Sequence, residues 1–220
     1  PTPLVRVESP STFGSGGKDI GKLCKPHSVA LNGTEQEVYV FDDNNRISVF
    51  DLNGNYLRTI GREGAGDCEF RHPGGLFFDP ASSLLLVADS SNNRIQMIQP
   101  AGPGTLVRQF GSRGKAHGKF ICPVAVAMHP VTRNIFVCDN NNHRLQVFDE
   151  EGVYQYQIGA SASSPYQLDY PTRLCIDSVA DEVYVTESGT DRVSVFSTEG
   201  KFLRCFGATG SDAGQLICPI

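Results

Sequence analysis

The sequence lacks several patterns that would each point to a different class of protein. No apolar run approaches the roughly 18 residues that a membrane-spanning helix needs, and no signal-peptide pattern opens the chain. No segment keeps the period of an amphipathic helix over a useful length. The 220 residues, 40% of them hydrophobic, still suffice to bury a core in one domain. The sequence therefore predicts an all-β domain without a membrane partner.

Motifs for catalysis and metal binding are missing as well. No Gly-x-Ser-x-Gly elbow is present, and the five histidines do not follow the spacings of zinc sites. The turns rich in Asp and Asn lack the alternating ligands of a calcium loop. The glycine-rich segment 14–19 lacks the spacing of a phosphate-binding loop and is predicted to be a link between repeats. We therefore expect no catalytic residue, no metal and no cofactor in this domain.

The seven cysteines are an odd number and include no Cys-x-x-Cys pair. Cys138, Cys175 and Cys205 lie inside apolar strand patterns, where free cysteine behaves as a small hydrophobic residue. This usage favours a reduced, cytoplasmic protein. The chain starts at Pro1 rather than at Met, which leads us to expect a segment of a longer protein.

What the sequence does contain is one segment that occurs four times. Residues 86–98 combine an apolar strand that ends in an acid, a short polar turn, and a second strand that opens with arginine. The four equivalent arginines, at positions 46, 94, 144 and 192, are 48, 50 and 48 residues apart. The prolines that open successive units, at positions 26, 73, 123, 171 and 219, are 47, 50, 48 and 48 residues apart. The chain is therefore a repeat protein.

Each unit of nearly 50 residues holds four short strand patterns, for example 27–31, 38–42, 46–51 and 56–60. One four-stranded sheet cannot bury both of its faces, so such units stack around an axis as the blades of a β-propeller. We predict a single propeller domain over residues 1–220. Its four complete blades lie approximately at 26–72, 73–122, 123–170 and 171–218, and residues 1–25, with a strand at Leu4–Val7, form the tail of a preceding blade.

The repeat resembles that of the NHL-repeat propellers over residues 26–219. Residues 134–152 match best, because they contain the run Asn142-His143-Arg144-Leu145-Gln146-Val147-Phe148, which is close to the motif that names the family. The resemblance extends to the C-terminal domains of tripartite-motif (TRIM-NHL) ubiquitin ligases and translational repressors. It implies a six-bladed ring that binds protein or single-stranded RNA. A minority of the wider family are lyases.

Four units are fewer than the six blades that the resemblance implies. We therefore expect an open arc, a fragment of a larger six-bladed propeller, with exposed apolar faces on the first and fourth blades. Uncovered end faces of a repeat array favour self-association.

Each unit also repeats an acid and an arginine around the polar turn: Asp42 and Arg46, Asp89 and Arg94, Asp139 and Arg144, and Glu187 and Arg192. One interpretation is a ring of functional groups. The other is structural, because a bidentate bond between arginine and carboxylate would lock each turn or bridge two blades. We prefer the structural interpretation because every unit has the pair, whereas a functional site usually breaks repeat symmetry. Replacing Arg94 with alanine is then expected to cost on the order of 1–3 kcal/mol of stability.

The net charge of -5 argues against indiscriminate binding of polyanions, yet the charges are unevenly placed. We call the end of the blades that holds the first-to-second and third-to-fourth strand turns the turn rim, and it is strongly acidic. The opposite end, with the second-to-third strand turns and the links between blades, is the link rim. Its loop 111–120 holds Arg113, Lys115, His117 and Lys119 without an acid, which together with the nearby Phe120 suits phosphate and base contacts.

From these patterns we predict a non-enzymatic recognition module that binds a protein partner through the link rim. It would be the target-binding domain of a larger TRIM-NHL-like ubiquitin ligase or post-transcriptional regulator. The alternative is a single-stranded RNA-binding domain that uses the basic loop, and the third interpretation is a lyase-type enzyme with a metal in the central channel. The predicted binding residues are Lys25, His27, Arg71, His72, Arg113, Lys115, His117, Lys119, Tyr170 and Arg173.

Overall fold

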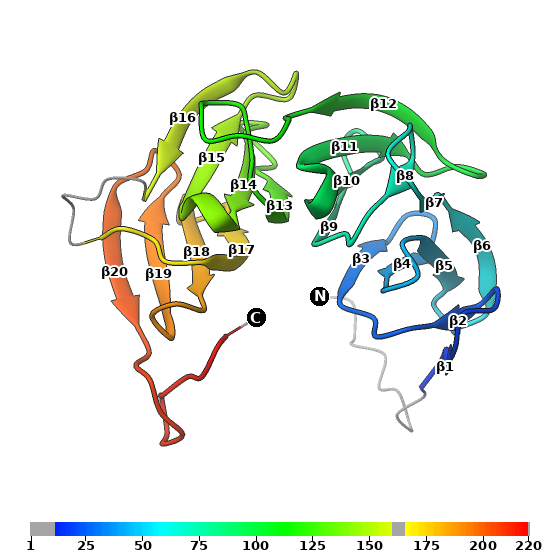
Figure 1. Cartoon of the computed structure of the whole chain (residues 1–220), viewed down its shortest axis with the longest axis horizontal. Helices are drawn as coiled ribbons and strands as arrows, with labels where there is room; N and C mark the ends of the chain where they lie inside the picture. Colours follow the sequence, from blue (N-terminus) through cyan, green and yellow to red (C-terminus); the bar gives the residue numbers. More distant parts are fainter. Residues whose placement is uncertain (1–11, 160–165, 220) are drawn as a thin grey trace.

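The computed structural model describes residues 12–159 and 166–219 as four antiparallel sheets placed around a common axis (Figure 1). In each sheet the strands are adjacent in the order in which they occur in the chain. Blade 1 consists of β3 (Ser28–Asn32), β4 (Glu37–Phe41), β5 (Ile47–Asp51) and β6 (Tyr56–Ile60). Blade 2 consists of β9 (Leu76–Asp79), β10 (Leu84–Asp89), β11 (Arg94–Gln99) and β12 (Thr105–Phe110). The predicted strand at Leu4–Val7 lies outside the described residues.

Blades 3 and 4 repeat this plan. Blade 3 consists of β13 (Pro123–Met128), β14 (Ile135–Asp139), β15 (Arg144–Phe148) and β16 (Tyr154–Ile158). Blade 4 consists of β17 (Pro171–Asp177), β18 (Glu182–Glu187), β19 (Arg192–Ser197) and β20 (Phe202–Phe206). The polar turn is a short 3-10 helix in two blades, η1 (Ser90–Asn92) and η2 (Asn140–Asn142). The prediction of an all-β propeller with four complete four-stranded blades is confirmed.

The hydrophobic core lies between neighbouring blades. Tyr39 and Val49 of blade 1 pack with Leu85 and Val87 of blade 2, and similar clusters join blade 2 to blade 3 and blade 3 to blade 4. A middle strand such as β14 is buried on both faces because it lies between two other sheets, whereas the outer strand β16 exposes alternate residues. This arrangement explains why the inner strands are apolar without a clear alternation.

No such cluster joins blade 4 to blade 1 within the described part of the chain, and the blades form an arc rather than a closed circle (Figure 1). The free face of blade 1 exposes Val29 and Leu31, and the free face of blade 4 exposes Phe206. These residues are the exposed apolar end faces that the repeat count predicts. Self-association through them stays a prediction.

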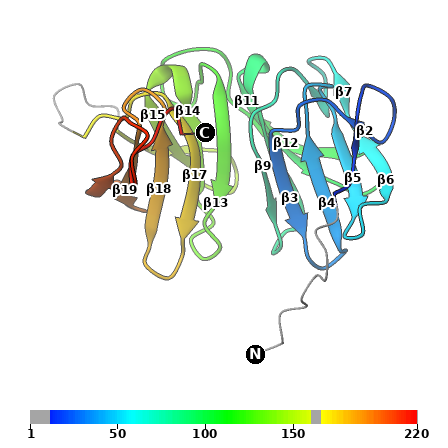
Figure 2. The same cartoon turned by 90° about the horizontal axis from the view of Figure 1, so that it is seen from below.

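The links between blades run along one rim, where β2 (Lys22–Leu23) and β7 (Arg62–Glu63) lie in Figure 2. In the described part of the chain, four segments on this rim fold back on themselves. Two do so through short parallel strand pairs, β1 (Ser15–Gly16) with β2 and β7 with β8 (Glu69–Phe70), and two through a single bridge, Arg113 with Phe120 and Thr209 with Leu216.

A buried residue anchors the link between blades 2 and 3. Phe120 is fully buried against Phe110 and Phe148, with ring centroids 6.4 and 5.5 Å away. Gly111 has a φ of +95°, and a Cβ atom on it would lie 2.4 Å from the Phe120 ring, so this close approach requires glycine. The interpretation of Phe120 as an accessible aromatic for base contacts is wrong, because the side chain belongs to the core between the blades.

On the turn rim, an ion pair joins blade 3 to blade 2. Arg133 donates to both carboxylate oxygens of Asp79, at 2.9 and 2.6 Å. Burial raises the pKa of Asp79, but the hydrogen bonds from Arg133 and Ser82 and the charge of Arg133 outweigh it and bring the pKa to about 2. The charged form is therefore favoured by folding, which links this pair to stability at acid pH.

We expect the Asp79 carboxylate to contribute about 2 kcal/mol of stability at neutral pH. Since the folded-state pKa lies below that of the unfolded chain, this contribution is present above about pH 4 and is lost as the pH falls toward about 2. Urea unfolding of the native protein and of Asp79→Asn, compared across this range, measures it. A stability difference between the two proteins that stays constant down to pH 2 would contradict the assignment.

Candidate functional site

The repeated acid and arginine form a structural unit in three blades. In blade 3 the Asp139 carboxylate is fully buried and accepts a hydrogen bond from Arg144 Nε at 2.9 Å. Arg144 also donates to the carbonyl oxygens of Ala116 and Lys119, both at 3.0 Å, and so holds the link that enters the blade. Burial raises the pKa of Asp139, although hydrogen bonds from Asn142, the Ile121 backbone and Arg144 oppose the shift. These residues therefore attach the link to the blade.

Blades 2 and 4 use the same arrangement, with Arg94 Nε 2.8 Å from Asp89 and Arg192 Nε 2.9 Å from Glu187. Blade 1 differs. Asp42 accepts from Asn44 and from the Cys24 backbone, while Arg46 donates to the carbonyl oxygens of Lys18, Asp19 and Lys22. A bond between Asp42 and Arg46 was expected from the repeat, and the described contacts contain none. In this blade the arginine and the acid bind the link through separate hydrogen bonds, and the acid also binds the turn.

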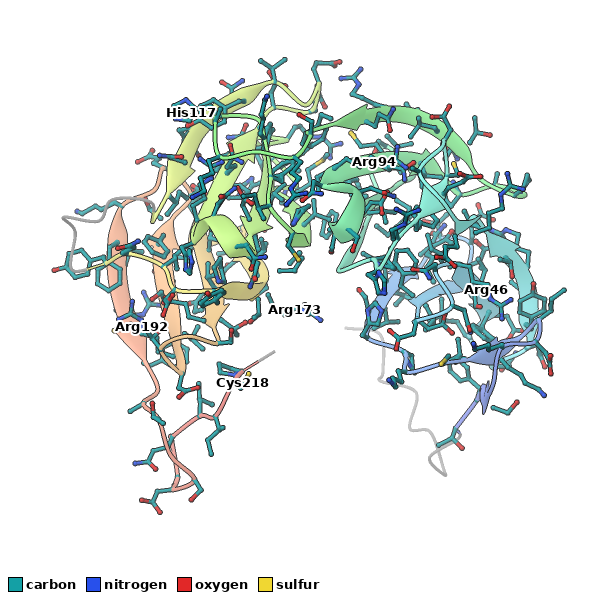
Figure 3. All side chains as sticks on the ribbon, in the orientation of Figure 1. Arg46, Arg94, His117, Arg173, Arg192 and Cys218 are labelled. Atoms are coloured by element: carbon teal, nitrogen blue, oxygen red, sulfur yellow. The ribbon has the colours of Figure 1, made fainter. Side chains whose placement is uncertain are left out.

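A pocket of about 310 Å³ opens near the axis on the link rim. It is lined by residues at or just before the start of the innermost strand in the first three blades, by the second-to-third strand turns of blades 1 and 2, and by β17 of blade 4. Arg173 extends from β17 toward this central region (Figure 3). The lining residues are His27, Asp43, His72, Pro73, Gly74, Ser90, Cys122, Val124 and Arg173. We call this the axial pocket.

Arg173 breaks the symmetry of the repeat. The residue two positions after the opening proline is Ser28, Gly75 or Ala125 in the other blades, and only blade 4 places a cation there. Arg173 is half-buried and donates to the carbonyl oxygens of Thr172, at 2.9 Å, and His27, at 3.4 Å. Among the residues that the structure describes, no carboxylate forms an ion pair with it.

The axial pocket is lined by charged groups of both signs, Arg173 and Asp43. Asp43 is the acid that lines it, and it lies 3.6 Å from Lys25 Nζ and 3.8 Å from His27 Nε2. Burial lowers the pKa of His27, and the charge of Arg173 lowers it further, while Asp43 acts in the opposite direction. A negatively charged group that entered the pocket would therefore meet an arginine without an acid partner and a histidine that it would help to protonate.

The structure divides the predicted binding residues into separate groups. His27, His72 and Arg173 meet in the axial pocket, and Lys25 contacts its acid, Asp43. Arg71 is exposed beside it and uses its backbone N–H to bond Asp89. Tyr170 packs edge-on against His143, with ring centroids 4.3 Å apart, away from the pocket.

The basic loop is a second group, near the outer edge of the link rim. His117 stacks on Tyr154 of β16 with ring centroids 4.5 Å apart, far from Arg173 in Figure 3. Arg113, Lys115 and Lys119 are exposed, and no ion pair is described for them. In the equivalent link between blades 1 and 2, Glu69 occupies the position of Lys119 and lies 2.7 Å from Arg62. The positive charge of the basic loop is therefore not balanced by an acid, whereas the charge of Arg62 in the equivalent link is balanced by Glu69.

Sequence reasoning missed six residues of the axial pocket: Asp43, Pro73, Gly74, Ser90, Cys122 and Val124. Four of them are an opening proline or flank one, a position that the repeat identifies, and the other two, Asp43 and Ser90, follow the acid at the end of the second strand. Aligning these positions across all four blades would have found them.

The described residues contain no group of three or more His, Cys, Asp or Glu side chains that could hold a metal ion. All seven cysteines have free thiols. In the described ranges, no helix has both the length and the apolar character to span a membrane.

Comparison with known proteins places the fold. Residues 125–205 match a family described as a 6-bladed beta-propeller (DUF5128). A stretch of 99 residues is 33% identical to peptidyl-glycine alpha-amidating monooxygenase A of Xenopus laevis, covering 42% of this chain and 10% of that protein.

Two solved structures share the architecture at low sequence identity. A chain of a nidogen/laminin complex aligns with a TM-score of 0.66 and 16% identity, covering 84% of this chain and 64% of the other. A streptogramin B lyase aligns with a TM-score of 0.61 and 16% identity, covering 88% and 57%. This chain thus spans less than two thirds of each of these relatives. It has the β-propeller fold, and its third and fourth blades match a family of six-bladed propellers.

Proposed function

We propose that this propeller is a non-enzymatic recognition module that binds a protein partner through the axial pocket, with a carboxylate of the partner on Arg173. The observation that carries the proposal is Arg173 itself, a half-buried cation without an acid partner at a position where the other blades have Ser, Gly or Ala. A guanidinium group in such surroundings binds a carboxylate through two charge-assisted hydrogen bonds. His27 and His72 line the same pocket and add two imidazole groups. The nidogen/laminin complex supports the proposal in so far as a propeller of this fold occurs there with a protein partner.

The proposal extends to the parent protein. The motif at residues 142–148 supports an NHL-type domain, and free thiols suit a cytoplasmic location. On this basis the domain would select the target of a larger TRIM-NHL-like ubiquitin ligase or post-transcriptional regulator.

The test is capture of partners from cytoplasmic lysate on the immobilised domain, with and without RNase, followed by affinity measurement with the captured protein. Arg173→Ala is expected to weaken binding at least tenfold, since it removes a charge-assisted pair, and to leave the unfolding midpoint nearly unchanged. Arg71→Ala is the matched control, because Arg71 is an exposed cation on the same rim outside the pocket. Equal binding by native protein and Arg173→Ala would rule out the axial pocket.

The second candidate function is binding of single-stranded RNA by the basic loop. It is favoured by the three uncompensated cations and by the stacked pair of His117 and Tyr154, which offers a flat surface to a base. Lys119→Glu introduces the residue found at the equivalent place in the neighbouring link and is expected to weaken binding of a uridine-rich 10-mer about tenfold. Affinity for RNA that is the same in both proteins, or capture of partners that RNase does not affect, would count against this candidate.

A further inference from the structure

A second cavity, of about 450 Å³, lies on the opposite rim between blades 1 and 2. Its walls come from the first-to-second strand turns of both blades and from the third-to-fourth strand turn of blade 2. They include Asn32, Glu35, Glu37, Tyr39, Arg58 and Ser83. We call it the turn-rim cavity, and the repeat explains why it is open.

The same place is filled at the other two blade interfaces. Each first-to-second strand turn has a residue of positive φ at its end: Gln36, Ser83, Arg133 and Asp181. Between blades 2 and 3, Arg133 crosses the interface and binds Asp79 and, at 3.3 Å, Glu150. Between blades 3 and 4, Asp181 lies 3.3 Å from His129 Nε2.

Between blades 1 and 2 the equivalent residues are Ser83 and Asn32. The serine side chain is several bonds shorter than that of arginine. Among the described residues, no hydrogen bond joins the side chains of Ser83 and Asn32. Asn32 instead accepts from the backbone of Thr34 and Glu35. The position that the Arg133 side chain occupies between blades 2 and 3 is therefore not filled by the equivalent residue between blades 1 and 2.

The groups on the cavity wall suit a guanidinium group. The charge of Glu37 is neutralised by Arg58, and its carboxylate also accepts a hydrogen bond from the Tyr39 hydroxyl at 2.7 Å. The Glu35 carboxylate is exposed, and no ion pair is described for it, so one negative charge at the cavity remains uncompensated. The Arg58 guanidinium group already donates to Glu37, at 2.8 Å, and to the Pro100 carbonyl oxygen, at 2.9 Å, so Glu35 is the acid left for an added cation among the described wall residues. A peptide residue that carries a guanidinium group meets this requirement.

We infer that the turn-rim cavity binds an arginine side chain of a partner protein. Arginine is the residue that this chain itself uses at the equivalent interface, and the surrounding rim is acidic. Asp51, at the end of β5 on the same rim, adds a negative charge that would attract a basic segment toward the cavity. This surface is separate from the axial pocket, so the inference does not depend on the function proposed there.

The experiment uses the whole domain and an acetylated, amidated tripeptide with a central arginine, titrated while backbone amide shifts are recorded by NMR. Saturable shifts are expected at Glu35, Ser83 and Ala101. A peptide with citrulline in place of arginine keeps the shape, loses the charge, and is expected to bind at least tenfold more weakly.

Two variants test the site from the protein side. Ser83→Arg places an arginine side chain of the protein itself in this position and should abolish the shifts. Arg133 has a positive φ at the equivalent position, which indicates that arginine is tolerated in this turn. Glu35→Gln should weaken binding at least fivefold, whereas Glu199→Gln, which removes an acid of the same rim far along the arc, should change it little. Retained binding by Ser83→Arg, equal binding of both peptides, or equal effects of the two acid variants would overturn the inference.

Discussion

Arg144→Ala is expected to lower the free energy of unfolding by about 3–5 kcal/mol, the range observed when one partner of a buried ion pair is removed. The Arg144 side chain is 6% exposed and that of Asp139 is 0% exposed, so the remaining carboxylate would stay buried without its cation. The same change removes the bonds to the Ala116 and Lys119 carbonyl oxygens and so releases the link that enters the blade. Urea unfolding followed by circular dichroism measures the loss.

Arg46→Ala is the matched control at the equivalent position of blade 1. Among the described residues, Arg46 bonds carbonyl oxygens of the link and no side chain, and Asp42 keeps its contacts with Asn44 and Cys24 when the arginine is removed. Its loss is expected to cost only about 1 kcal/mol. Equal costs for the two variants would show that the buried carboxylate is not the source of the effect. Unchanged stability of Arg144→Ala with loss of partner binding would show that the motif is functional.

The fold could be predicted because its signals are local and repeated. A strand such as 56–60 has turn residues on both sides, and its boundaries in the structure are those predicted from the repeat. The assignment of acid and arginine to structure follows from the same repetition, and three of the four blades confirm the pairing. The blade 1 exception could not be seen, because the acceptors of Arg46 are carbonyl oxygens, which leave no trace in the sequence.

The sites were harder to predict because they depend on residues far apart in the chain. His27 and Arg173 are separated by 146 positions and meet only because the blades curve around an axis. The turn-rim cavity exists because Ser83 is smaller than its counterpart Arg133, a difference that is informative only when two interfaces are compared. The sequence patterns correctly predicted that these loops share one rim. They could not show which loop residues lie near the axis and which lie at the outer edge.

The loops that link the blades also contribute core residues. Removing one of these side chains is expected to cause the second large loss of stability. Phe120→Ala is expected to cost about 3–5 kcal/mol, as for other large aromatic side chains removed from a packed core. Phe120 is fully buried and its ring lies 5.5 Å from that of Phe148, so truncation would leave a void between blades 2 and 3. Thermal and urea unfolding should both detect the change.

Phe120→Leu provides the matched control, because Leu168 occupies the equivalent position in the next link and is itself buried. This substitution keeps most of the volume and should cost about 1 kcal/mol. The two variants also separate the structural assignment from the base-contact interpretation of the basic loop. If Phe120 stacked on nucleic acid, alanine would weaken RNA binding and leave stability unchanged. The buried position predicts the reverse: a large loss of stability, and in the folded fraction an affinity for RNA close to that of the native protein.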